Sequence, residues 1–198
     1  MVQVYDEAGV AHPATILIAG PVTVLKVLTK ETDGYFAVQV GFGEQKEARL
    51  TKAEKGQRKG LGNFRTVQEF RITEELAATY KQGDILDVTQ FKEGDRIVVR
   101  SKSKGKGFQG AVKRYHFKGG RRSHGQKHSE REVGTIAGGG RGGSGRVAKG
   151  KRMPGRMGGD MITVQNLKVL QAHKETNELV VEGSLPGVRG VLVSIESK

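Results

Sequence analysis

Lysines alternate with small residues near the middle of the chain, and aromatic residues follow directly. Residues 101–118 read SKSKGKGFQGAVKRYHFK. Small residues between the lysines let a backbone approach a polyanion closely, and aromatic rings beside cations offer stacking surfaces for unpaired bases. The pattern therefore predicts a surface that binds RNA phosphates and bases, with a solvated charged loop as the alternative.

Basic side chains continue as far as residue 156, among glycines. Histidines that stand among arginines are suited to donate hydrogen bonds to phosphates or 2′-hydroxyls. Residues 138–146 (GGGRGGSGR) predict a flexible tip. The residues that we expect to contact RNA are Lys102, Lys104, Lys106, Phe108, Lys113, Arg114, Tyr115, His116, Lys118, Arg121, Arg122, His124, Lys127, His128, Arg131, Arg141, Arg146, Lys149, Lys151, Arg152 and Arg156.

Two glycine motifs in this segment match nucleotide-binding patterns only in part. Residues 105–110 (GKGFQG) fit GxGxxG, but the βαβ context of a dinucleotide site does not follow, and the HRD and DFG motifs of protein kinases are missing. Residues 145–151 (GRVAKGK) approach a phosphate-binding P-loop, yet Arg152 stands where a magnesium-binding Ser or Thr is needed. We therefore expect no nucleotide site and no enzyme.

Histidines could also indicate a metal site or a hydrolase. His116, His124 and His128 have no Asp, Glu or Cys at a convincing ligand spacing. Ser123 precedes His124 but lacks a nucleophile elbow and an acid partner. The sequence predicts no cofactor and no protein-bound metal, although magnesium associated with the RNA is compatible with it.

The positive charge of the chain lies in one internal segment. The 198 residues carry a formal net charge of +13, with a pI of about 10.0. Residues 101–160 hold 16 Lys+Arg against 3 Asp+Glu, whereas residues 1–100 and 161–198 are each neutral. The same segment has 17 of the 30 glycines and only four Val, Ile or Leu residues. Because so little aliphatic surface cannot offset the ordering entropy, we expect this segment to be disordered until a polyanion binds.

The sequence gives no indication of a membrane-bound or secreted protein. It contains no apolar run of 18 residues, no signal-peptide pattern and no cysteine, which suits a reducing compartment. Residues 101–160 offer no amphipathic helix for a membrane surface. We expect a cytoplasmic location, no membrane partner and no small-molecule substrate.

The neutral flanks read as short β-branched strands separated by turn residues such as Gly20-Pro21. Residues 73–78 predict a short helix, with Thr73 as N-cap and Gly83 as the stop. Many short strands with turn signals suggest a small β-barrel. The expected strands are residues 14–18, 22–28, 35–40, 66–72, 84–88, 95–100, 161–170, 178–182 and 191–195.

The predicted architecture is therefore mainly β and discontinuous. Residues 1–100 and 161–198 form a β-barrel domain, within which the polar residues 44–64 make an exposed excursion. Residues 101–160 form a long, basic, glycine-rich extension inserted between strands of the barrel. The barrel is the rigid base and the extension is the RNA-binding part.

Three stretches resemble large-subunit ribosomal proteins of the L-three family, in its bacterial type. They are SKGKGFQGAVKR at 103–114, GKRMPGRMGG followed by VQNL within 150–167, and LVVEGSLPG at 179–187. The similarity covers nearly the whole chain in the same order. It implies a translation-protein-like barrel on the subunit surface and an extension that runs through ribosomal RNA (rRNA) toward the peptidyl transferase centre. It also implies early binding during subunit assembly, with neighbouring large-subunit proteins against the barrel.

The chain departs from the family pattern at its start and at the tip of the extension. Family members usually begin with a short strand containing glycine and lysine before a Met-Thr step, and Met1 lies about where that Met would be. We therefore expect one strand to be missing from a barrel edge. The tip between Ile136 and Val147 is longer than usual and lacks the Gln that some bacterial members carry as a methylation target, so no methylation is inferred.

Two other functions are weighed against a structural ribosomal protein. A free-standing RNA chaperone is one, because Arg141-Gly142-Gly143 suits an RGG-type arm; unlike a ribosomal protein, it would be lost from salt-washed large subunits. An enzyme that uses the GxGxxG motif is the other, and nucleotide-induced thermal stabilisation would reveal it. The charge distribution favours the ribosomal protein.

Overall fold

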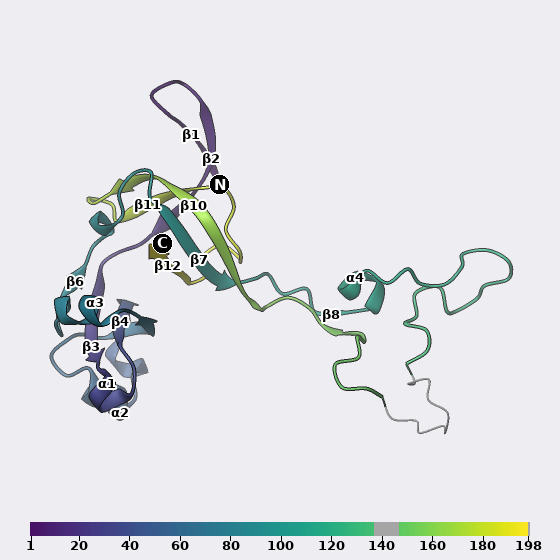
Figure 1. Cartoon of the computed structure of the whole chain (residues 1–198), viewed down its shortest axis with the longest axis horizontal. Helices are drawn as coiled ribbons and strands as arrows, with labels where there is room; N and C mark the ends of the chain where they lie inside the picture. Colours follow the sequence, from purple (N-terminus) through teal and green to yellow (C-terminus); the bar gives the residue numbers. More distant parts are fainter. Residues whose placement is uncertain (137–146, 198) are drawn as a thin grey trace. The chain divides into compact units, whose positions relative to one another are not determined.

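The computed structural model describes residues 1–136 and 147–197. The chain is mainly β, as predicted (Figure 1). It divides into two compact units. One comprises Met1–Val98, Gln165–Ser184 and the chain from residue 196 onward, and the other comprises Val99–Val164 and Leu185–Ile195.

The strands form three sheets. Their bounds are β1 Val2–Tyr5, β2 Ala11–Ile18, β3 Val22–Leu28, β4 Ala37–Glu44, β5 Phe64–Arg71, β6 Ile85–Leu86, β7 Arg96–Lys102, β8 Phe108–Gln109, β9 Gly155–Arg156, β10 Met161–His173, β11 Glu178–Glu182 and β12 Val193–Ser197. The sheet orders are β1-β2-β11-β10-β7-β12, β5-β4-β3-β6 and β8-β9. Within the described residues none of these sheets closes on itself, so the small barrel stays a prediction.

The helices are short. Their bounds are α1 Lys30–Asp33, η1 Glu47–Arg49, α2 Lys52–Gln57, α3 Glu74–Thr79, η2 Val88–Gln90 and α4 Ala111–Tyr115. Helix α3 follows Thr73 as predicted, although the Thr73 side chain makes no capping hydrogen bond. The prediction that Gly83 stops this helix was wrong, because the helix ends at Thr79. Gly83 (φ +94°) instead shapes the turn before β6, where its N–H donates to the carbonyl of Val24 at 2.9 Å.

The four-stranded sheet buries one apolar face. Strands β3 and β4 pair Val24 with Val40 and Val27 with Val38, and cross-strand pairs of β-branched residues stabilise antiparallel sheets. Alternate side chains of a strand point to the same face, so Val24, Val38 and Val40 are buried together. The partly buried residues that pack on this cluster are Val22, Val27, Phe70, Ile72, Tyr80 and Leu86.

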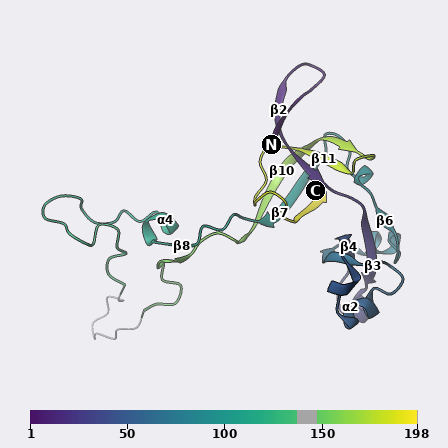
Figure 2. The same cartoon turned by 180° about the vertical axis from the view of Figure 1, so that it is seen from behind.

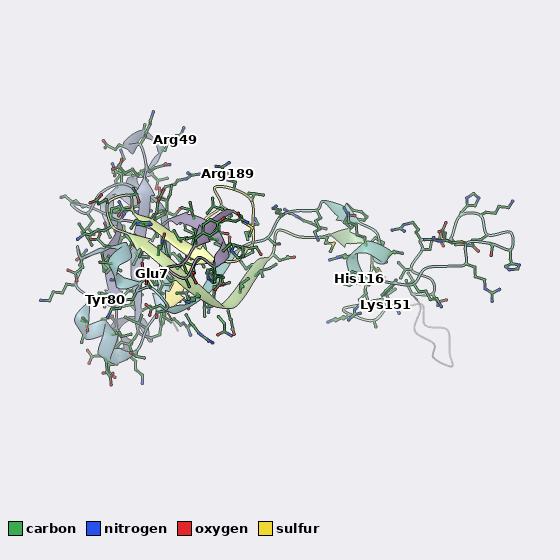
Figure 3. All side chains as sticks on the ribbon, turned by 90° about the horizontal axis from the view of Figure 1, so that it is seen from above. Glu7, Arg49, Tyr80, His116, Lys151 and Arg189 are labelled. Atoms are coloured by element: carbon green, nitrogen blue, oxygen red, sulfur yellow. The ribbon has the colours of Figure 1, made fainter. Side chains whose placement is uncertain are left out.

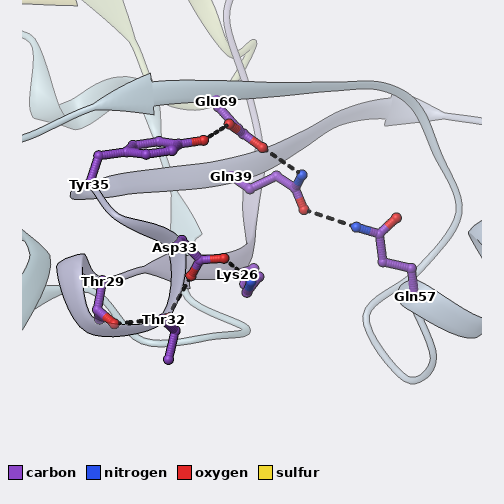
Figure 4. A network of polar contacts seen from close by, with 8 residues as sticks. All are labelled: Lys26, Thr29, Thr32, Asp33, Tyr35, Gln39, Gln57 and Glu69. Carbon is purple, nitrogen blue, oxygen red and sulfur yellow. Dashed lines mark hydrogen bonds and ion pairs between the residues drawn. The ribbon is translucent and has the colours of Figure 1, made fainter.

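A chain of polar contacts connects this sheet to the segment that contains α2 (Figure 4). The Tyr35 hydroxyl and the Gln39 amide both donate to the Glu69 carboxylate at 3.1 Å. The Gln57 amide, at the end of α2, donates to Gln39 at 3.4 Å. These contacts are exposed, so each contributes little to stability, but together they orient the polar segment on the sheet.

Residues 44–64, the predicted exposed excursion, hold η1 and α2. Most of their side chains are exposed or half-buried, but Arg58 is buried. Its guanidinium donates to the carbonyl of Phe64 at 2.8 Å and lies 3.5 Å from the Glu54 carboxylate. Arg58 therefore fastens α2 to the start of β5.

The β1–β2 hairpin belongs to the same sheet as β11 (Figure 2), and His12 on β2 contacts two other segments there. Its Nδ1 lies 3.1 Å from a Glu182 carboxylate oxygen on β11, and its Nε2 lies 3.3 Å from an Asp6 carboxylate oxygen. The hydrogen bond with Glu182, then that with Asp6, raises the pKa of His12. The pKa of Asp6 is lowered, chiefly by the N–H of Val10.

Replacing His12 with Gln is expected to cost the most stability while the imidazole is charged. A raised histidine pKa contributes stability that is fully present below the unfolded pKa of about 6.5 and is lost as pH rises through the folded pKa. The difference in unfolding free energy between the parent and His12→Gln should therefore be largest near pH 5 and should become smaller at alkaline pH. Denaturant unfolding across a pH series measures it, and a difference that grows with pH would contradict the ion-pair assignment.

Candidate nucleic-acid interface

The basic arm is defined as residues 101–160. Its outgoing and returning backbone segments run side by side (Figure 1). The N–H of Ser103 donates to the carbonyl of Asp160, and the N–H of Lys106 donates to that of Met157, both at 2.9 Å. Strands β8 and β9 then pair as an antiparallel ladder. The outgoing and returning halves of the arm therefore position each other.

Glycines allow the two halves to come this close. Gly158 has φ +74°, and a methyl group there would overlap the carbonyl oxygen of Lys104. At Gly155 a methyl group would overlap the guanidinium of Arg114. A side chain at position 158 would push the two halves apart, because it would overlap backbone, whereas a side chain at position 155 would displace the Arg114 guanidinium.

Beyond the ladder, Arg114 acts as a brace across the arm. Its Nη1 donates to the carbonyl of Met153 at 2.8 Å, and its guanidinium carbon lies 4.9 Å from the centre of the Tyr115 ring. Arg152 approaches the same ring at 5.7 Å, and the Phe117 ring centre lies 6.1 Å from it. These cation–π and ring contacts hold helix α4 against the returning chain. Arg114 and Tyr115 are half-buried, so part of their surface already serves the protein.

The loop after α4 is closed by backbone and side-chain contacts. The N–H of Gly120 donates to the carbonyl of Glu130 at 2.8 Å, and Arg122 Nε lies 2.9 Å from a Glu130 carboxylate oxygen. Because the Arg122 side chain is 85% exposed, this ion pair is weak in water. It would exchange readily for a phosphate.

Most of the predicted RNA-binding side chains are exposed, and Figure 3 shows side chains extending from both strands of the arm, with His116 and Lys151 labelled. Phe108 is 76% exposed, which leaves its ring available for stacking. Arg141 and Arg146 lie outside the described residues. The exposed side chains for which no carboxylate lies within 4 Å among the described residues are Lys102, Lys104, Lys106, Lys113, His116, Lys118, Arg121, His124, Lys127, His128, Arg131, Lys149, Lys151, Arg152 and Arg156.

The described part of the chain has neither a cluster of metal ligands nor a membrane-spanning helix. No group of three or more His, Asp or Glu side chains there could hold a metal ion. No helix in that part is long and apolar enough to cross a membrane.

Known proteins similar to this chain are ribosomal proteins of the large subunit. Three bacterial relatives are each called large ribosomal subunit protein uL3. The one from Desulfotalea psychrophila is 45% identical over 100% of this chain and 94% of its own length. The relative from Dehalococcoides mccartyi is 42% identical over 99% and 93% of the two chains, and that from Desulforudis audaxviator is 42% identical over 100% and 91%.

Residues 17–194 also match the family model described as Ribosomal protein L3. The chain therefore belongs to the ribosomal protein L3 family, which confirms the resemblance found in its motifs. This membership makes it a structural component of the large ribosomal subunit rather than an enzyme.

Proposed function

We propose that the chain binds large-subunit rRNA directly, through its basic arm. The observation that carries the proposal is the charge distribution: the whole net charge of +13 lies in residues 101–160. Within the described residues most of the arm's cations are exposed and have no carboxylate partner. Such cations release condensed counterions when they meet phosphates, which is the main source of affinity for RNA backbones.

The arm offers two kinds of RNA contact. Exposed lysines such as Lys104 and Lys113 are suited to phosphates, because an ammonium group is a compact charge on a flexible stem. The exposed ring of Phe108 is suited to stack on an unpaired base. The histidines, Arg141 and Arg146 complete the proposed surface.

The finer architecture is proposed from the family resemblance. Residues 1–100 and 161–198 form a small β-barrel on the subunit surface, and neighbouring ribosomal proteins contact it. The arm runs through rRNA toward the peptidyl transferase centre, and the protein binds early and assists assembly of the subunit. The chain acts in the cytoplasm within the ribosome, and any magnesium near the arm belongs to the RNA.

Binding of the purified chain to large-subunit rRNA is expected to weaken steeply with salt. Each phosphate contact contributes about 0.7–0.9 to the slope of log K against log salt concentration. With about six or more contacts the slope should exceed about 4 in magnitude. Equilibrium binding over a salt series measures it.

A slope near one would contradict the proposal, because a single contact is not an RNA-binding arm. The control is a chain from which residues 101–160 are deleted and replaced by a short glycine-serine linker. If that control keeps its secondary structure by circular dichroism, it should lose both the affinity and the steep slope.

A further inference from the structure

A groove lies at the root of the arm, where three backbone segments meet. Its volume is about 430 Å³, which is within the usual range of ligand pockets, about 300–1,000 Å³. The outgoing segment contributes Ser103, Lys104 and Lys106, and the returning segment contributes Asp160. All of its lining residues belong to one compact unit of the chain.

Glycines fix the walls of this groove. Besides Gly158, Gly187 has φ +110°, and a methyl group there would overlap the Val191 side chain and the carbonyl oxygen of Lys102. Ser103 and Asp160 are joined through their backbones at 2.9 Å, and the N–H of Asp160 also donates to the Ser103 hydroxyl at 3.3 Å. The backbone segments that carry the lining residues are therefore held together by close backbone contacts.

The lining combines apolar surface with two kinds of charge. Met157, Ile162, Leu185 and Pro186 supply the apolar part, and Ile162 is 42% exposed. Apolar walls suit the faces of a heterocyclic base, and flanking lysines suit the phosphates on either side of it. The lining thus matches one nucleotide better than a continuous stretch of RNA backbone.

Asp160 is an acidic residue at the groove, and binding to phosphates by positive charge alone does not account for it. It is one of only three acids in residues 101–160. Its side chain is exposed, and no lysine or arginine among the described residues lies within 4 Å of its carboxylate. A carboxylate near phosphates is repelled by them, so its presence in an RNA-binding surface needs a compensating hydrogen bond. The exocyclic amine of a base can donate such a bond to a carboxylate.

We infer that this groove takes a single unpaired rRNA base that carries an exocyclic amine (adenine, cytosine or guanine), with Asp160 accepting from the amine. The inference rests on the proposed function and adds a base-specific contact to it. Lys104 and Lys106 hold the flanking phosphates, and the apolar walls cover the faces of the base. Uracil, which has no exocyclic amine, is disfavoured.

The test is the sign of the effect of Asp160→Asn on rRNA affinity. If Asp160 is only one more charge, its neutralisation removes repulsion and leaves binding equal or tighter. If it accepts from a base, the amide keeps one acceptor oxygen but loses the negative charge, so the charge-assisted hydrogen bond to the amine is weakened and binding should fall about three- to tenfold. The matched control is Glu132→Gln, which neutralises another exposed acid of the arm and should leave binding equal or tighter.

Chemical probing of the RNA gives a second measurement that does not depend on affinity. With saturating parent protein, one base should be protected on its Watson–Crick edge from dimethyl sulfate or kethoxal. With saturating Asp160→Asn, that base should become more reactive than it is with the parent, because the contact is weaker, while backbone protection nearby persists. Circular dichroism and thermal unfolding confirm that the variant is folded.

The outcomes separate this inference from the proposed function. Asp160→Asn binding as tightly as the parent, with no base exposed, would overturn the base site while the steep salt slope still supports an rRNA-binding arm. A shallow slope for the parent protein itself would overturn the proposed function, and the base site with it.

Discussion

Removal of four exposed lysines from the basic arm is expected to weaken rRNA binding by about 100-fold or more at about 0.15 M salt. Each lysine that meets a phosphate contributes about 0.7–0.9 to the salt slope, so the slope should fall by about 3 in magnitude. Arg114 is not among the four, because its guanidinium braces the arm. The four substitutions are Lys104→Ala, Lys106→Ala, Lys113→Ala and Lys118→Ala, all at exposed positions.

The matched control removes the same charge from the neutral flank of the chain. Lys30, Lys52, Lys81 and Lys92 are also exposed, and their replacement by alanine should change affinity by less than about threefold, with little effect on the slope. Equal losses in the two quadruple variants would mean that binding follows overall charge rather than the arm. Unfolding midpoints of both variants should stay near that of the parent, since surface substitutions usually change stability by about 0.5 kcal/mol or less.

Arg114 and Lys113 are neighbours with opposite expected roles. In the RNA complex, Arg114→Ala should speed amide hydrogen exchange about 10- to 100-fold in residues 108–115 and 153–156, because it removes a charge-assisted hydrogen bond to Met153. The cation–π contact with Tyr115 is lost as well. The affinity for rRNA should fall because the arm is loosened. The slope of log K against log salt concentration should change by no more than the contribution of about one phosphate contact.

Lys113→Ala is the control for this brace, because Lys113 is exposed and forms no ion pair within the described residues. This substitution should lower the magnitude of the salt slope by the contribution of about one phosphate contact. It should leave hydrogen exchange in the arm unchanged. The brace would be refuted if the two variants gave the same exchange pattern. Mass-spectrometric exchange on the two complexes, prepared at saturating protein, makes this comparison.

Strand positions were predictable where the apolar pattern is local. The expected strands at residues 22–28 and 178–182 coincide with β3 and β11, because β-branched runs between turn residues specify a strand without help from distant contacts. The strand expected at 84–88 shortens to Ile85–Leu86, and Val88 instead begins a 3-10 turn. That difference depends on tertiary packing, since Val88 is buried.

Helices α1, α2 and α4 were not predicted, and α2 and α4 were missed for different reasons. Helix α2 has a capping box in which Thr51 and Glu54 exchange side-chain and backbone hydrogen bonds, and the Thr-x-x-Glu spacing could have revealed it. Helix α4 has no side-chain cap, and its five residues are too few for propensity to matter. Its position depends on the brace to Met153, 39 residues away in the chain.

The candidate interface was predictable as a surface but not in its internal contacts. Charge and glycine content identify residues 101–160 from the sequence alone. They cannot separate the bracing role of Arg114 from the exposed Lys113, because both are cations in one run. The position of Asp160 in a groove could not be predicted either, because the groove also depends on residues 185–187 of a different segment.

RNA–protein crosslinking in intact large subunits, mapped to residues of this chain, tests the central claim most directly. The account predicts that crosslinked peptides concentrate in residues 101–160, with lysines and aromatic residues of the arm at the linked positions. Crosslinks confined to residues 1–98 and 165–184, with the arm left unlinked, would contradict it.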